Sequence, residues 1–382
     1  MKKIDFIYFD AGGGHRAAAT ALKTVMEADK RPWEVRLVHV QELLDPVDVF
    51  RKVTGLRLED VYNKMLEKGW TLGSALGLKF MHAVIRRYHR PSVRLFEDHF
   101  RQSKPDLVVS VVPNFNRALY ESLRATLPGV PYVTVLTDFA DYPPHFWMEP
   151  KQEQYFVCGT EKAVAQARAM GYGRERIFRT SGMIIRPMFY EPVNVDRAKE
   201  RVRLGLDPEK LTGLVLFGAQ GSKVMIDMAK RLQDTQLIFI CGRNQKLAEA
   251  LRALPSKAAR FVEGFTTGIP YYMHLADFLV GKPGPGSISE AVAMKLPVIV
   301  ECNAWTVPQE RYNAEWVREQ GVGVVLSNFR AIRQAVSELG PNLASFRSNV
   351  AKIENRAILE IPTILQKILD QNSLERQAAN CG

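Results

Sequence analysis

The stretch that decides the fold is VGKPGPGSISEA at residues 280–291, which continues the apolar run Phe278-Leu279-Val280. The apolar run predicts a buried strand, the glycine-proline segment predicts a turn, and residues 287–294 predict the beginning of a helix. A strand that enters a helix through glycines leaves backbone N–H groups pointing at one place, which suits a phosphate group. The alternative is a tight strand-to-helix turn in which Ser287 only caps its helix.

The beginning of the chain repeats this pattern. Residues 4–9 predict a strand, DAGGGHR at 10–16 predicts a glycine loop, and residues 17–28 predict a helix. Another loop of this kind, GAQGS at 218–222, also follows an apolar run. Strands and helices alternate on both sides of a proline-containing crossover at 181–192, so we expect an α/β protein whose two halves face each other across a cleft.

Size and composition exclude several classes of protein. At 382 residues the chain is long enough for two domains, and no apolar run approaches the about 20 residues that span a bilayer. The segment before the first glycines is too short for a signal peptide, so we expect a cytoplasmic protein. The cysteines lack metal-ligand spacing, which predicts reduced thiols and no metal site; they are Cys158, Cys241, Cys302 and Cys381.

The net charge of +11 is unevenly distributed along the chain. Residues 51–104 hold 12 Lys and Arg against 5 Asp and Glu, interleaved with apolar and aromatic side chains. This mixture predicts amphipathic helices on an anionic membrane surface, although helices that pack between domains with their charges in water would show the same pattern. The sequence has no RNP-like strand, zinc finger or basic zipper, so no nucleic-acid partner is expected. The candidate membrane residues are Trp70, Phe80, Arg86, Arg87 and Arg90.

The loop TDFADYPPHFW at 137–147 follows a strand predicted at 132–136. Loops at the carboxyl ends of parallel strands carry ligand-binding residues, and this loop offers carboxylates, a histidine and large aromatic side chains. Asp138 is a candidate general base, and His145 and Trp147 are candidates for contact with an apolar acceptor. The alternatives are that Asp138 is a turn residue and that Trp147 belongs to the core.

In this order and spacing, the motifs resemble those of one enzyme family. The chain is similar to the GT-B glycosyltransferases of the monogalactosyldiacylglycerol synthase and processive diacylglycerol glucosyltransferase type, which are related to MurG and belong to glycosyltransferase family 28. The similarity covers nearly the whole chain. It is carried by residues 10–16, 182–187, 242–244, 263–265, 282–291 and 308–310, together with Asn313.

The resemblance implies two Rossmann-like domains facing a cleft, with a C-terminal helix that crosses back to the first domain. On this basis we expect an N-terminal acceptor and membrane-binding domain at 1–187, a UDP-sugar-binding domain at 188–354, and a crossing helix with a frayed tail at 355–382. The implied reaction uses no cofactor and no metal ion, because helix N-termini and backbone amides balance the charge of the leaving diphosphate.

The resemblance also implies roles for residues of the second domain. The uracil of the UDP-sugar would lie near Phe265 and Arg243, and Glu290 would bind the ribose hydroxyls. The residues expected to contact the diphosphate or the sugar are Gly218, Ser222, Gly284, Pro285, Gly286, Ser287, Gln309 and Glu310.

The expected reaction inverts the anomeric carbon, with a base that takes the proton of the acceptor hydroxyl. The candidate bases are Asp10, His15 and Asp138, near the acceptor-loop glycines Gly13 and Gly14. We expect a hexose to pass from UDP-glucose or UDP-galactose to diacylglycerol or another lipid acceptor, on an anionic membrane at the inner face of the cell. The loops at 218–222 and 141–147 depart from the family pattern, so the sugar and the acceptor stay open. The alternatives are transfer to a polyprenyl-diphosphate lipid, a soluble UDP-sugar 2-epimerase, and a non-catalytic lipid or nucleotide-sugar sensor.

Overall fold

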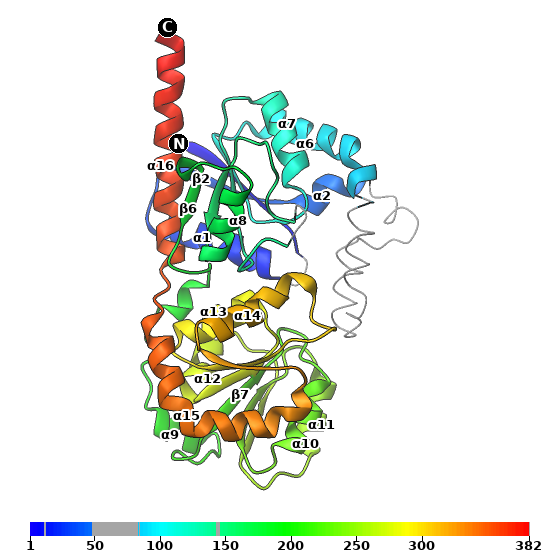
Figure 1. Cartoon of the computed structure of the whole chain (residues 1–382), viewed down its shortest axis with the longest axis vertical. Coiled ribbons are helices and arrows are strands. Elements are labelled where there is room, and N and C mark those ends of the chain that lie inside the picture. Colours follow the sequence, from blue (N-terminus) through cyan, green and yellow to red (C-terminus); the bar gives the residue numbers. More distant parts are fainter. Residues whose placement is uncertain (11–12, 48–82, 84, 143–145, 382) are drawn as a thin grey trace. The chain divides into compact units, whose positions relative to one another are not determined.

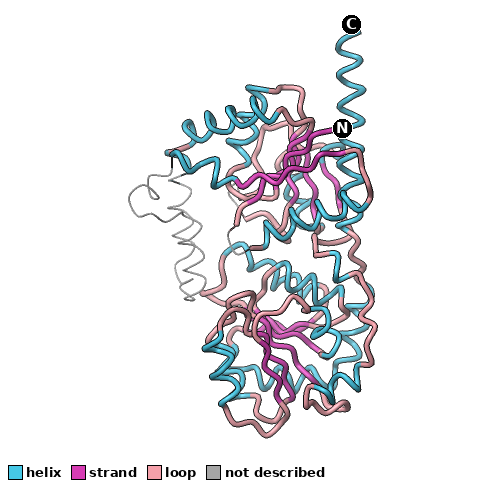
Figure 2. Tube along the Cα trace, turned by 180° about the vertical axis from the view of Figure 1, so that it is seen from behind, coloured by secondary structure: helices cyan, strands magenta, loops and turns pink. Residues whose placement is uncertain are grey.

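Two units make up the fold of the chain. The computed structural model describes residues 1–10, 13–47, 83, 85–142 and 146–381. Unit 1 consists of Met1–Pro187 with Arg356–Gly382, and unit 2 consists of Met188–Asn355. Each unit contains a six-stranded sheet whose neighbouring strands all run parallel, with helices on both faces (Figures 1 and 2). The prediction of an α/β protein with two halves is therefore confirmed.

The sheet of unit 1 has the strand order β2-β1-β3-β4-β5-β6. The order reverses between β1 and β3, and ligands of open α/β sheets bind at such a reversal, beyond the carboxyl ends of the strands. The loop that carries Gly13 and His15 begins there. The elements are β1 (Lys2–Tyr8), α1 (Gly14–Ala28), β2 (Trp33–His39), α2 (Val40–Leu44), η1 (Asp45–Val47), α6 (His89–Ser103), β3 (Leu107–Ser110), α7 (Asn116–Thr126), β4 (Tyr132–Val135), β5 (Tyr155–Cys158), α8 (Glu161–Ala169), η2 (Arg174–Arg176), β6 (Ile177–Arg179) and α16 (Ala357–Cys381).

The sheet of unit 2 has the order β12-β11-β10-β7-β8-β9, which reverses between β7 and β10. The two glycine loops predicted to hold a diphosphate follow these two strands. The elements, after η3 (Pro187–Phe189) at the boundary, are α9 (Arg197–Arg203), β7 (Thr212–Leu216), α10 (Val224–Arg231), β8 (Gln236–Ile240), α11 (Gln245–Ala253), β9 (Arg260–Glu263), α12 (Ile269–Leu275), β10 (Phe278–Gly281), α13 (Pro285–Ala293), β11 (Val298–Glu301), η4 (Pro308–Glu310), α14 (Arg311–Glu319), β12 (Gly323–Leu326), η5 (Phe329–Ala331) and α15 (Ile332–Lys352).

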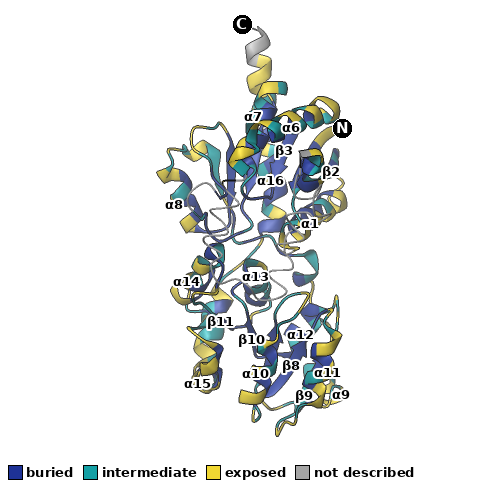
Figure 3. Ribbon diagram, turned by 90° about the vertical axis from the view of Figure 1, so that its right-hand side faces the viewer, coloured by how far each residue is buried: buried dark blue, intermediate teal, exposed yellow. Residues whose placement is uncertain are grey.

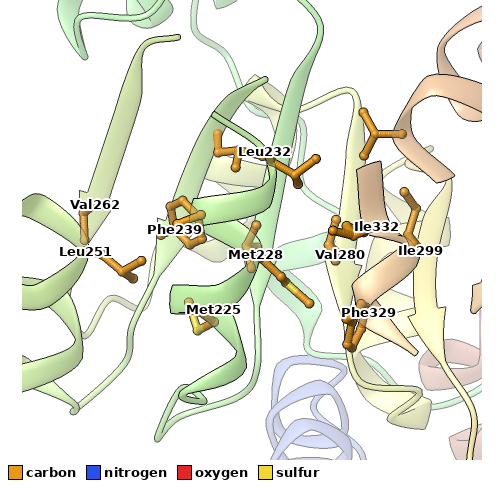
Figure 4. Packing of buried hydrophobic residues seen from close by; sticks show 14 of the residues in the cluster. Met225, Met228, Leu232, Phe239, Leu251, Val262, Val280, Ile299, Phe329 and Ile332 are labelled. Carbon is orange, nitrogen blue, oxygen red and sulfur yellow. The ribbon is translucent and has the colours of Figure 1, made fainter. Parts of the chain in front are cut away.

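Apolar strands form the centre of each unit. The inner strands β3, β4, β5, β7, β8 and β10 are buried along their whole length, as expected for parallel strands covered on both faces (Figure 3). The edge strands β2, β6, β9 and β12 are largely intermediate in burial. In unit 2, Met225 and Met228 of α10, together with Ile332 near the start of α15, pack against Phe239 and Val280 of the sheet (Figure 4). Each side chain of this size contributes about 1.5–3 kcal/mol when it is fully buried. These cores hold the strand ends, and with them the loops, in fixed positions.

The C-terminal helix α16 packs against α1 of unit 1 (red in Figure 1). The sequence predicted a frayed tail, but α16 continues to Cys381. The reason is a tertiary contact, because Asn372 Nδ2 and Arg376 Nε donate hydrogen bonds to the Gly129 carbonyl at 3.0 Å and 3.1 Å. The polar composition of the tail gave no sign of these bonds.

Asp277 binds the start of β10 to two helices of unit 2. Its carboxylate accepts hydrogen bonds from Arg197 (2.7 Å), Arg201 (2.8 Å), Arg347 (2.6 Å) and the Thr212 N–H (2.8 Å). Burial alone would raise the pKa of Asp277, but the bonds from Arg197, Thr212 and Arg201 lower the pKa overall. The cluster therefore supports the amino edge of the sheet, opposite the glycine loops.

Replacement of Asp277 by Asn should lower the free energy of unfolding at pH 7 by about 3 kcal/mol, because it leaves guanidinium groups without their counter-charge. This value is at the low end for buried pairs, since Arg197 and Arg347 keep 35% and 42% of their side-chain surface exposed. The folded pKa of Asp277 is lowered, so its stabilisation is present above the ordinary carboxyl pKa of about 4 and is lost as the pH falls through the folded value.

Urea unfolding of the wild type and Asp277→Asn at several pH values measures both effects. The difference between the two proteins should shrink once the pH falls below about 4 and continue to shrink as the pH passes through the lowered pKa of folded Asp277. Glu200→Gln, which breaks the surface pair with Arg203, is the matched control and should change stability far less. An Asp277→Asn protein as stable as wild type at pH 7 would contradict the assigned role.

Candidate functional site

Close contact between strand ends shapes the loops at the carboxyl edge of unit 2. A Cβ atom at Gly281 would lie 2.6 Å from the Leu216 carbonyl oxygen, and one at Gly242 would lie 2.1 Å from the Ala219 oxygen. Gly242 also has a φ of +59°, which side chains with a Cβ rarely adopt. The glycines therefore allow the loops after β7, β8 and β10 to approach one another. Arg243 N–H completes this contact by donating to Ala219 at 2.8 Å.

Helix α13 directs its free N–H groups to the same edge. It begins at Pro285, and its N-cap, Gly284, provides no side-chain hydrogen bond to the first turn. Ser287 therefore lies inside the first turn and is not the cap that the sequence left as an alternative. Gly286 borders open space, since a Cβ there would meet no atom within 4 Å. An uncapped N-terminus with a positive dipole end is suited to an anionic group such as a diphosphate.

The loop after β11 is linked to the loop that precedes α13. Lys282 Nζ lies 3.7 Å from Glu310 Oε1, and the buried Asn313 donates from Nδ2 to the Pro283 carbonyl at 2.9 Å. Gln309 and Glu310 belong to η4 in this loop and are partly buried. Site analysis of the sequence omitted Lys282 and Asn313, although both belong to the motifs that carried the family resemblance.

Arg243 and Phe265 form an exposed pair at the ends of β8 and β9. The guanidinium carbon of Arg243 lies 5.2 Å from the centre of the Phe265 ring, and Phe265 is 57% exposed. Such a cation–π pair presents a flat surface on which a nucleobase can stack. Glu290 of α13 and Ser222 of the loop after β7 are partly buried, and Gly218 in that loop has a φ of +75°. All of the predicted donor-binding residues lie in unit 2, in the segments that follow β7, β8, β9, β10 and β11.

His15 is the second residue of α1 in unit 1. The helix begins at Gly14, and its N-cap Gly13 has a left-handed backbone conformation. The Nδ1 atom of His15 lies 3.0 Å from Thr137 Oγ1, and its ring centre lies 5.8 Å from that of Trp147. The side chain is partly buried, and removal from water lowers the pKa of His15 from 6.5 to about 4, against smaller upward effects of the Val111 main chain and the Asp10 charge. The imidazole is therefore neutral at physiological pH.

Asp138 is held by Trp147 in the core of unit 1. The carboxylate is 7% exposed and accepts a hydrogen bond from Trp147 Nε1 at 2.9 Å. The Trp147 main-chain N–H donates to Asp141 at 2.7 Å, and the indole is fully buried. The expectation that Trp147 grips an apolar acceptor is wrong for this structure, because the indole has no exposed face. Trp147 instead positions Asp138 and packs against His15.

Asp10 forms an ion pair with the exposed Arg16. Its carboxylate pairs with Arg16 at 3.2 Å, and it influences His15 through its charge. Of the candidate bases, His15 and Asp138 both contact Trp147. His145 lies outside the described residues, as do Trp70 and Phe80.

An arginine-lined hollow lies at the N-terminal end of α6. Its volume is about 760 Å³, and the lining residues are Arg86, Arg87, His89, Arg90, Pro91, Arg94 and Leu95. The four arginine side chains are exposed. Arg94 was missed in the sequence analysis, although its spacing of four residues from Arg90 places the two on the same face of α6. A surface of this charge is suited to phosphate groups.

Within the described part of the chain, no helix combines the length and apolar character needed to cross a membrane. In the same residues, no group of three or more His, Cys, Asp or Glu side chains is placed to hold a metal ion.

Both units match families of glycosyltransferases. Residues 15–185 match the family model for monogalactosyldiacylglycerol (MGDG) synthase, and residues 213–364 match the glycosyltransferase family 28 C-terminal domain. Monogalactosyldiacylglycerol synthase 2 of Arabidopsis thaliana is 28% identical over 363 residues, which cover 88% of this chain and 73% of the relative.

Solved structures show the same fold at lower identity. MurG of Acinetobacter baumannii aligns with a TM-score of 0.63 and 14% identity, covering 96% of this chain and 100% of that chain. The Anabaena protein HepE in complex with UDP-glucose aligns with a TM-score of 0.55 and 15% identity, covering 97% of this chain and 100% of that one. The GT-B fold expected from the sequence is confirmed by these likenesses.

The neutral state of His15 can be tested directly. In an NMR titration, the ring C–H signals that disappear in His15→Gln should titrate near pH 4, because burial disfavours the imidazolium. The folded pKa is below that of the unfolded chain, so the unfolded state binds the proton first and the protein loses stability as the pH falls from about 6.5 to about 4. His15→Gln should lack this part of the pH dependence. A His15 titration near 6.5 would show that the ring is solvated.

Proposed function

Because the chain belongs to glycosyltransferase family 28, with the monogalactosyldiacylglycerol synthases, and is a UDP-sugar-dependent enzyme that acts on a lipid acceptor, we propose that it transfers a hexose from UDP-glucose or UDP-galactose to diacylglycerol. The observation that carries the donor part is the uncapped N-terminus of α13, where the strand order of unit 2 reverses. The acceptor part rests on the relatives, which are named for monogalactosyldiacylglycerol synthesis.

In the proposed reaction, unit 2 binds the donor. Uracil stacks on the Arg243–Phe265 pair, the diphosphate lies at Gly286 and Ser287, and the loop with Gln309 and Glu310 contacts the hexose. The C1–O bond to the β-phosphate breaks as the acceptor oxygen attacks C1 from the opposite side, so the anomeric configuration is inverted. Negative charge that develops on UDP is stabilised by the N–H groups and dipole of α13.

Unit 1 supplies the base. His15 is neutral and less buried than Asp138, so it is the group that takes the proton of the acceptor hydroxyl. Thr137, which precedes Asp138 in the chain, lies within hydrogen-bond distance of His15, and the charge of Asp10 favours the imidazolium that forms. Trp147 keeps Asp138 in place. The remaining candidate, Asp10, is engaged by Arg16 and adjusts the charge around His15.

The first test is product formation. The purified chain is mixed with labelled UDP-glucose or UDP-galactose and diacylglycerol in anionic vesicles, and lipids are separated by thin-layer chromatography. A labelled glycolipid is expected with one of the donors, and its rate should not change with EDTA because the helix dipole stabilises the leaving group. Transfer only to a polyprenyl-diphosphate lipid, or epimerised UDP-sugar without any glycolipid, would overturn the diacylglycerol assignment.

Variants of the proposed base separate chemistry from donor binding. His15→Gln should lower kcat by about 10²–10⁴, the usual contribution of a general base, and leave the affinity for UDP unchanged. Asp138→Asn should lower kcat less, because it weakens the acceptor of the Trp147 indole N–H, and Trp147 packs against His15. Glu290→Gln is the control on the donor side and should weaken UDP binding. Full activity of His15→Gln would exclude His15 as the base.

The arginine-lined hollow supports peripheral binding to an anionic membrane, and we expect this at the cytoplasmic face of the cell membrane. Reversing the charge of Arg87, Arg90 and Arg94 to Glu should weaken vesicle binding at least about a hundredfold, since each basic residue near such a surface contributes about 1 kcal/mol. Sedimentation with anionic vesicles measures this. The matched control has the same charge change on another part of unit 1, at Lys162, Arg168 and Arg174. Equal loss in both variants would indicate a general effect of net charge.

A further inference from the structure

Trp305 exposes a large apolar surface in unit 2. Half of its surface is accessible, and Phe265 is the other aromatic residue of comparable exposure among the described residues. Ala304 before it is also exposed, whereas residues 306–308 after it are buried, so the exposure is confined to the tip of the turn. Burial of an indole contributes more binding free energy than burial of most side chains. A ligand that covers the exposed Trp305 ring would therefore gain affinity.

The loop around Trp305 is fixed by hydrogen bonds. The Trp305 N–H donates to Asn303 Oδ1 at 2.8 Å, and the Asn303 N–H donates to Thr306 Oγ1 at 3.0 Å. Asn303 Nδ2 donates to the Ser327 carbonyl at 3.1 Å, which anchors the turn beside the end of β12. The indole is thus presented by an ordered turn, and little conformational entropy would be lost when a ligand binds to it.

The order of strands places Trp305 at one end of the donor site. Phe265 follows β9 and Trp305 follows β11, and the strands between them are β8, β7 and β10. The two residues are thus four strand spacings apart, roughly 19 Å at about 4.8 Å per spacing. The diphosphate loops after β7 and β10 lie between them. A nucleotide sugar has the same linear order, with the base at one end, the diphosphate in the middle and the hexose at the other end.

We infer that Trp305 is a stacking residue for the donor hexose. The indole lies against the C–H face of the pyranose ring, while Gln309 and Glu310 of the same loop bond its hydroxyls. The link from Lys282 to Glu310 keeps this loop beside the diphosphate. The inference rests on the proposed donor site and adds to it a residue that determines how tightly the sugar is held.

Calorimetric titration of the full chain with UDP, UDP-glucose and UDP-galactose, without acceptor lipid, tests the inference. Trp305→Ala should raise the Kd of the bound UDP-hexose about three- to tenfold, the range for one lost aromatic contact, and leave the Kd of UDP within about twofold. Trp305→Phe should retain most of the affinity. Phe265→Ala is the matched control, because it removes an equally exposed aromatic from the base end and should weaken UDP and UDP-hexose alike.

Two results would overturn the inference. Equal weakening of UDP and UDP-hexose by Trp305→Ala would mean that the residue only supports the loop. Unchanged UDP-hexose binding together with weaker sedimentation on anionic vesicles would make Trp305 a membrane contact instead. A failure of the proposed function would be recognised separately. If the wild-type chain binds UDP-hexose but forms no glycolipid, the diacylglycerol assignment is wrong and the role of Trp305 is unaffected. If the wild-type chain binds no UDP, both the proposed function and the role of Trp305 are wrong.

Discussion

The donor site of unit 2 depends on how closely neighbouring strand ends can approach. At Gly281 a Cβ would lie 2.6 Å from the Leu216 carbonyl, so any side chain there would push β10 away from β7 at the point where the strand order reverses. That reversal positions the start of α13 beside the loop after β7. The N–H groups at the start of α13 therefore depend on a short backbone contact between β10 and β7 for their position.

The two units use different physical means at their carboxyl edges. Unit 2 relies on main-chain groups, a helix dipole and an exposed Arg243–Phe265 pair, all of which suit an anionic ligand with an aromatic base. Unit 1 relies on burial, which keeps His15 neutral and holds Asp138 against the Trp147 indole. A neutral imidazole accepts a proton, whereas a charged one would attract the leaving diphosphate instead. The chemical difference between the units follows from this difference in solvation.

Much of the fold was predictable because its signals are local. Glycine loops after apolar runs identified the strand ends, and the alternation of strands and helices predicted two α/β halves, which the sheets confirm. Errors came from contacts distant in sequence. Trp147 has the same sequence context whether it faces solvent or packs beside His15, and the polar tail is helical because Asn372 and Arg376 reach Gly129. The cluster around Asp277 joins α9, β10 and α15, so no short motif announces it.

By itself the sequence determined which residue types stand at the strand ends, since hydrophobic periodicity and glycine spacing are local properties of the chain. It thereby indicated the glycine loops, His15 and the helix that begins near Ser287. Only the tertiary structure decided solvation and neighbourhood: that the pKa of His15 is lowered to about 4, that Trp147 is buried and Trp305 exposed, and that Lys282 meets Glu310. Burial and distance depend on every element that packs around a side chain, and this sum is not readable from any one segment.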